Sequence, residues 1–107
     1  MINRIVKLEF KEDKISDFLS LFDQIKNFIN EFPGCLGTKL YHSINNPSVI
    51  ITHSCWTSEE SLNKYRNSKK FKETWIKIKP WFKEKPLAWS MHEHFNGFKK
   101  KSNCHLN

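Results

Sequence analysis

Apolar residues in the first third of the chain follow two different periods. Over residues 2–10 they alternate, which predicts a strand with Arg4, Val6, Leu8 and Phe10 on one face. Between residues 15 and 29 they recur every three or four positions, which predicts an amphipathic helix. Residues 11–13 offer a turn and a candidate N-cap for this helix. The helix must end before Pro33-Gly34, because proline cannot continue it.

Residues 35–44 and 48–56 are predicted to form two strands of a hairpin, because Asn45-Asn46-Pro47 between them is typical of a turn. The second strand carries apolar side chains on both faces: Val49, Ile51 and Cys55 on one, Ile50 and Trp56 on the other. A sheet covered on one face only would alternate more cleanly. We therefore expect the second face to be covered as well, most simply by a second copy of the chain.

The second half of the chain predicts two helical segments and a last strand. Thr57-Ser58-Glu59-Glu60 is a capping box, and Asn67-Ser68 indicates a break and a fresh cap. A second apolar stripe of four residues predicts a helix that extends to Phe82. Pro80 either interrupts this helix or starts its last turn. Residues 88–95 alternate again and predict the final strand. We expect residues 96–107, which are polar and basic, to form a frayed tail.

The predicted order is β-α-β-β-α-β, which defines a ferredoxin-like α+β fold. It gives a four-stranded antiparallel sheet with the helices on one face, and we expect two such sheets to pack into a homodimer. The length of 107 residues fits a single domain, here residues 1–95 followed by the basic tail at 96–107.

Charge and cysteine content limit which partners and which cellular compartment we expect. The net charge of +7 lies in residues 55–107, which contain twelve Lys or Arg and five Asp or Glu. Sixteen of the chain's eighteen cations are lysines, and neither inner strand matches an RNA-recognition motif, so we expect a solvated surface and no nucleic-acid partner. No apolar run is long enough to cross a membrane. Three cysteines without a CxxC pair, and no secretory signal, predict a cytoplasmic protein.

Few side chains form a candidate catalytic or metal site. His92 and His94 share one face of the expected last strand, a spacing that can bind a metal, but no third ligand is evident and we expect no metal site. His53, in mid-strand beside Cys55, is a candidate base or donor in a pocket, or else a hydrogen-bonded histidine at an interface.

Aromatic side chains are the unusual feature. Seven of them lie on faces that must meet between helices and sheet: Phe18, Phe22, Trp56, Tyr65, Phe71, Trp75 and Phe82. They predict either a bulky core or a cavity for a flat aromatic ligand. Trp56 stands out because it ends a strand at the start of a helix and its indole N–H needs a partner if buried.

The sequence resembles the antibiotic biosynthesis monooxygenase (ABM) family. The matching segments are residues 32–37, the turn at Asn46-Pro47, residues 56–62 with Tyr65, residues 68–71, and Trp75 with Lys79-Pro80. The segments occur in order between residues 32 and 80, and the resemblance covers residues 1–95, nearly the whole chain. The resemblance implies a dimeric α/β barrel, in agreement with the order derived above.

The resemblance implies a cofactor-independent monooxygenase that oxidises a small aromatic or quinol substrate with O₂. In such enzymes the deprotonated substrate reduces O₂ directly, so the protein supplies a dry aromatic pocket, a proton acceptor and a donor to an oxyanion. Trp56 corresponds to the family's tryptophan at the pocket wall, and His53 is the candidate acceptor. The expected substrate-binding residues are Phe22, Tyr65, Arg66, Phe71 and Trp75.

Several positions depart from the family's pattern, among them Thr52 and Trp75. Thr52 stands where some oxygenases of the family have an asparagine, and Trp75 stands where haem-degrading members have an iron-ligating histidine. Haem degradation is therefore disfavoured. Two alternatives stay open: a non-enzymatic module that binds an apolar small molecule, and a purely structural dimer. A cavity above roughly 300 Å³ would exclude the structural dimer.

Overall fold

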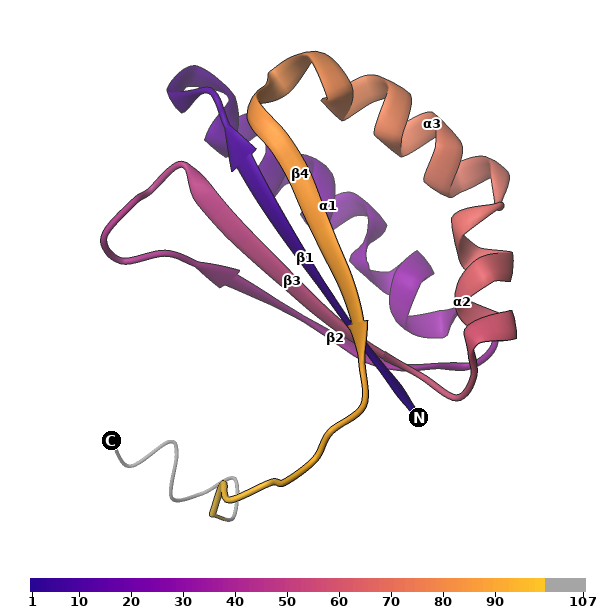
Figure 1. The fold of residues 1–107 in the computed structure, drawn as a ribbon. Coiled ribbons are helices and arrows are strands. Elements are labelled where there is room, and N and C mark those ends of the chain that lie inside the picture. Colours follow the sequence, from indigo (N-terminus) through magenta and orange to yellow (C-terminus); the bar gives the residue numbers. More distant parts are fainter. Residues whose placement is uncertain (100–107) are drawn as a thin grey trace.

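The computed structural model describes residues 1–99 and places four strands in one antiparallel sheet. The strands are β1 (Ile2–Phe10), β2 (Cys35–His42), β3 (Val49–Trp56) and β4 (Phe82–Met91), and the helices are α1 (Ile15–Glu31), α2 (Glu59–Arg66) and α3 (Lys69–Ile78). The strand order across the sheet is β2-β3-β1-β4, with every neighbouring pair antiparallel. The predicted β-α-β-β-α-β order is therefore confirmed, and Figure 1 shows the three helices on the same side of the sheet.

Helix α1 packs through the stripe that its period predicts. Its buried residues are Phe18, Leu21, Ile25 and Ile29, and they join a core cluster with Leu8, Phe10 and Ile50 from the central strands. The expected N-cap at residues 11–13 is wrong. Those residues lead into a 3₁₀ turn over Glu12–Lys14 in which no side chain caps the helix.

Two serines start the shorter helices. The Ser58 hydroxyl accepts a hydrogen bond from the Ser61 N–H at 3.1 Å and begins α2. The N-cap of α2 is therefore Ser58, one residue later than expected for a capping box that begins at Thr57. Ser68 accepts from the Phe71 N–H at 3.2 Å and begins α3, which confirms the predicted break before it.

The last strand starts earlier and ends earlier than the sequence predicted. It spans Phe82–Met91 instead of 88–95, because α3 ends at Ile78 and Pro80 lies in a 3₁₀ turn (Lys79–Trp81) that reverses the chain. Phe82 therefore belongs to the strand and stacks on Phe10 at 5.1 Å between ring centroids. The register of β4 on β1 shifts near Pro86, which suits a proline because it has no N–H for the ladder.

The sheet face that the helices leave open carries apolar side chains. Ile5 and Ile51 are half-buried there, and Leu87 and Trp89 of β4 are exposed by 47% and 44%. The two-sided apolar pattern predicted for β3 is thus present, and no helix within residues 1–99 covers this second face.

The described part of the tail, residues 96–99, has no regular secondary structure. The rest of the expected tail, residues 100–107, lies outside the described residues. None of the helices formed by residues 1–99 is long and apolar enough to cross a membrane.

Candidate functional site

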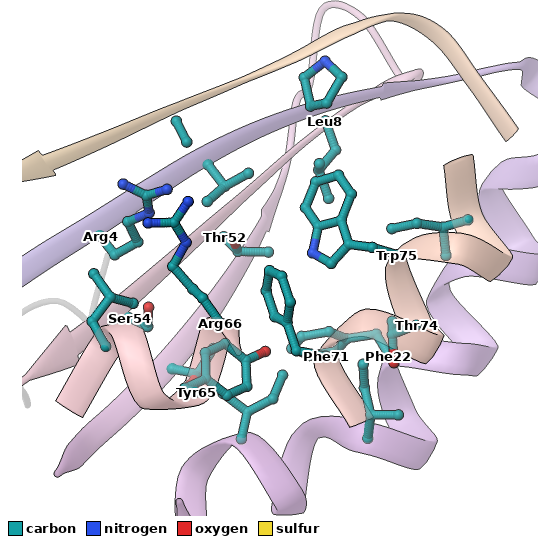
Figure 2. Close-up of a pocket in the computed structure, with 18 of the residues that line it drawn as sticks. Arg4, Leu8, Phe22, Thr52, Ser54, Tyr65, Arg66, Phe71, Thr74 and Trp75 are labelled. Atoms are coloured by element: carbon teal, nitrogen blue, oxygen red, sulfur yellow. The ribbon is translucent and has the colours of Figure 1, made fainter. Parts of the chain in front are cut away.

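A cavity of about 370 Å³ lies between the helices and the sheet. This volume is near the lower end of the range of small-molecule sites, about 300–1,000 Å³. All three helices and all four strands contribute to its wall (Figure 2). The lining is mainly apolar, and its polar members are Arg4, Thr38, Thr52, Ser54, Tyr65, Arg66 and Thr74. The cavity is larger than the limit of roughly 300 Å³ given for a purely structural dimer, so that alternative is excluded.

Aromatic rings form a continuous series around the cavity. From α1 the series runs through Phe22, Phe18, Phe10, Phe82, Trp75, Phe71 and Tyr65 to Trp56, with neighbouring centroids 4.5–6.3 Å apart. These distances are in the range at which aromatic pairs attract one another. The aromatic rings therefore pack against one another, and several of them also line the cavity. Both predictions for the aromatic residues, a bulky core and a cavity, therefore apply.

Five residues predicted to contact substrate come together at the cavity wall. Phe22 comes from α1, Tyr65 and Arg66 from the last turn of α2, and Phe71 and Trp75 from successive turns of α3. Figure 2 shows the Phe71 ring between Tyr65 and Trp75, so that the three rings follow one another along the cavity wall. The spacing of four between Phe71 and Trp75 places both on one face of their helix.

Trp56 does not line the cavity, contrary to its expected place at the wall. It is fully buried and lies behind Tyr65, with the two rings stacked at 5.0 Å. Its indole N–H donates to the Ser54 hydroxyl at 2.8 Å. The indole proton is therefore already used, and Trp56 acts on the cavity by supporting Tyr65 and orienting Ser54.

His53 lies on the other face of the sheet, so it is not brought together with Trp56. Strand alternation directs Thr52 and Ser54 to the cavity and therefore His53 away from it. Its Nε2 is 2.8 Å from Asn3 Oδ1 and 3.7 Å from Cys55 Sγ. This environment corresponds to the alternative of a hydrogen-bonded histidine at a prospective interface.

Arg4 is the polar residue that sequence reasoning missed. It stands on the helix-facing side of β1, paired in register with Ser54 and Ser90. One guanidinium nitrogen, Nη1, donates to the Ser90 hydroxyl at 3.0 Å. The available signal was an arginine on a strand face that otherwise carries Val6, Leu8 and Phe10.

Burial and charge shift two groups at the cavity in opposite directions. Burial lowers the pKa of Arg4, and the positive charge of Arg66 lowers it further. Burial raises the pKa of Tyr65 well above its usual value, and the nearby Cys35 acts in the same direction. Tyr65 therefore stays protonated at neutral pH and offers the cavity a neutral O–H donor.

Within residues 1–99, no Asp, Glu or His lines the cavity. The same part of the chain holds no group of three His, Cys, Asp or Glu side chains that could bind a metal ion. The pairing considered for His92 and His94 required a strand that continued to residue 95, but β4 ends at Met91. The cavity can thus bind and orient an aromatic molecule and donate hydrogen bonds to it.

Comparisons with known proteins agree with this architecture. The sequence profile of the antibiotic biosynthesis monooxygenases matches residues 1–75. A crystal structure of an antibiotic biosynthesis monooxygenase has a TM-score of 0.81 at 17% identity, covering 87% of this chain and 98% of that protein. A conserved protein from Methanosarcina mazei Go1 has a TM-score of 0.81 at 21% identity, with 86% and 91% covered. A protein from Mycobacterium tuberculosis has a TM-score of 0.81 at 14% identity, with 91% and 98% covered. The search of curated proteins gives no significant match.

The buried position of Trp56 predicts a structural effect of its substitution. Trp56→Ala removes a fully buried ring and should lower the free energy of unfolding by about 3–5 kcal/mol. Trp56→Phe keeps a ring against Tyr65 and should cost clearly less. Chemical denaturation of both variants measures the difference. Equal stability of the two variants would contradict the packed position of the indole.

Proposed function

Because the chain belongs to the antibiotic biosynthesis monooxygenase family, we propose that it is a monooxygenase that oxidises a small aromatic, quinol-type substrate with O₂ and without a cofactor. The observation that carries the proposal is the aromatic-walled cavity of about 370 Å³ with Tyr65, Arg4 and Arg66 at its border. In this proposal a planar ring lies against the wall formed by Phe71, Trp75 and Tyr65, and the cationic and O–H donors hold its oxygen atoms.

The substrate itself supplies the electrons in this reaction. A hydroquinone first loses a phenolic proton, and the resulting anion passes an electron to O₂. Radical recombination forms a carbon–oxygen bond, and loss of water leaves one oxygen atom in a hydroxyquinone. The quinol gives up four electrons and O₂ takes up four, so that quinol plus O₂ yields hydroxyquinone plus water. No external reductant is needed, and the protein contributes binding, orientation and electrostatics.

The side chains at the cavity favour the anionic form of such a substrate. Positive charge at Arg4 and Arg66 lowers the pKa of a phenol bound near them. The neutral Tyr65 hydroxyl is a donor to the oxyanion, the part first expected of Trp56. With no carboxylate or imidazole at the cavity wall within residues 1–99, the phenolic proton passes to water. Haem degradation is not supported, because no histidine lines the cavity within residues 1–99.

A binding module for an apolar small molecule is the second candidate. It needs the same aromatic lining, and the specific observation in its favour is that no side chain with the basicity of a carboxylate or an imidazole lines the cavity within residues 1–99. Turnover separates the two candidates, because a binding module consumes no oxygen.

A homodimer in the cytoplasm completes the proposal. The apolar side chains on the open face of the sheet support a second copy packed sheet against sheet, as the family resemblance implies. Both cysteines within residues 1–99, Cys35 and Cys55, are free, which supports a reducing compartment.

Oxygen uptake with a panel of hydroquinones tests the enzymatic proposal. We expect uptake by the metal-stripped protein that exceeds the autoxidation blank and saturates with substrate. Tyr65→Phe keeps the ring packing and removes the O–H donor, so kcat should fall at least about tenfold while thermal stability is unchanged. The matched control is Tyr41→Phe, which alters the exposed tyrosine of β2. Uptake at the blank level across the panel would instead favour the binding module.

Light scattering after size exclusion tests the dimer. The native chain should have twice the monomer mass at micromolar concentration, and Trp89→Lys should halve it by placing a charge on the open sheet face. Ile76→Lys is the matched control, because Ile76 is 75% exposed on α3, on the helix side. A native chain that is already monomeric would count against the paired sheets.

A further inference from the structure

Both arginines of the chain reach the same cavity. All sixteen other basic residues are lysines, and Arg4 and Arg66 are separated by 61 residues in sequence. Arg4 projects from β1 and Arg66 from the last turn of α2. Figure 2 shows the two guanidinium groups at the end of the cavity near Ser54, away from Trp75. The influence of Arg66 on the pKa of Arg4 agrees with this proximity.

This pair of cations has no acidic partner within residues 1–99. All four ion pairs in that part of the chain use lysines, and no Asp or Glu lines the cavity. Arg4 bonds to a neutral serine hydroxyl, which leaves its charge uncompensated. Arg4 is half-buried and Arg66 is exposed. Their two positive charges repel each other, and an anion between them would offset that repulsion.

The opposite end of the cavity has a different character. Leu8, Phe22 and Trp75 line it (Figure 2), and none of these side chains carries a charge. Between the two ends lies Tyr65, whose hydroxyl makes no hydrogen bond to any residue in the 1–99 range. The cavity therefore has a cationic end, a neutral donor in the middle and an aromatic end.

We propose that the substrate or ligand is an aromatic carboxylate. Its carboxylate lies between Arg4 and Arg66, and its ring lies against Phe71 and Trp75. A planar carboxylate matches the fork of donors on a guanidinium, and arginine stays charged under all relevant conditions. A ring hydroxyl on such a molecule would reach Tyr65. This inference deepens the proposed function and rests on the same cavity, but it concerns binding alone.

Calorimetric titration with two probes of nearly identical shape tests the inference. The probes are 1-naphthoic acid, which is anionic at neutral pH, and the neutral 1-naphthamide, in a buffer without carboxylate or phosphate. The native chain should bind the acid at least about tenfold more tightly than the amide, since a hydrogen bond to a charged group is worth that much. Arg4→Met and Arg66→Met should each reduce the affinity for the acid by a similar factor and leave the amide within twofold.

The matched control is Lys72→Met, which removes an exposed cation of α3 that does not line the cavity. It should leave both affinities unchanged. Arg66 is exposed, so its variant is expected to fold even if Arg4→Met is unstable, and Arg66→Lys should restore part of the preference. Equal affinities for acid and amide, a preference that survives Arg66→Met, or no binding of either probe at millimolar concentration would overturn the inference.

The result is distinguishable from failure of the proposed function. A preference for the acid that depends on both arginines, with no oxygen uptake from any quinol, would sustain the inference and refute the monooxygenase. Oxygen uptake from neutral quinols without any preference for the acid would sustain the monooxygenase and refute the inference.

Discussion

Contact between aromatic rings keeps the cavity open. Phe10 of β1 stacks on Phe18 of α1 at 4.5 Å and on Phe82 of β4 at 5.1 Å, and Phe82 continues the contact to Trp75 of α3 at 5.7 Å. Protein interiors normally close voids of this size, because a void forfeits dispersion contacts along its lining. Three of the wall rings, Phe18, Tyr65 and Trp75, each pack on a ring outside the lining, so collapse would break several ring pairs at once. The position of the Tyr65 hydroxyl in the site depends on this packing.

The fold could be predicted because its signals are local. Alternation defined β1, the turn residues Asn45-Asn46-Pro47 defined the hairpin, and a stripe of spacing three and four defined α1. The last strand was misplaced because an apolar stripe running through Ile78 to Phe82 has a helical period, whereas Pro80 turns the chain between them. The pairing of Phe82 with Phe10, which is 72 positions away in sequence, and the stacking of the two rings place Phe82 in the sheet.

Among the residues expected to form the site, those on helices line the cavity, whereas Trp56 and His53 on β3 do not. Phe71 and Trp75 share a helical face, so one inference placed both. Trp56 points to the correct side of the sheet, but whether it lines the cavity or lies behind Tyr65 depends on how α2 packs, which no local pattern records. Arg4 meets Arg66 only through strand register and the position of α2. Sequence spacing therefore predicts the walls of the cavity, and tertiary packing determines its charge.

Isotope labelling shows whether this cavity catalyses monooxygenation. The protein is incubated with a hydroquinone that supports oxygen uptake under ¹⁸O₂, and the product is analysed by mass spectrometry. The account predicts one ¹⁸O atom in the organic product and the other in water. A quinone without ¹⁸O, formed together with labelled hydrogen peroxide, would show that the chain only passes electrons to O₂ and would contradict the account.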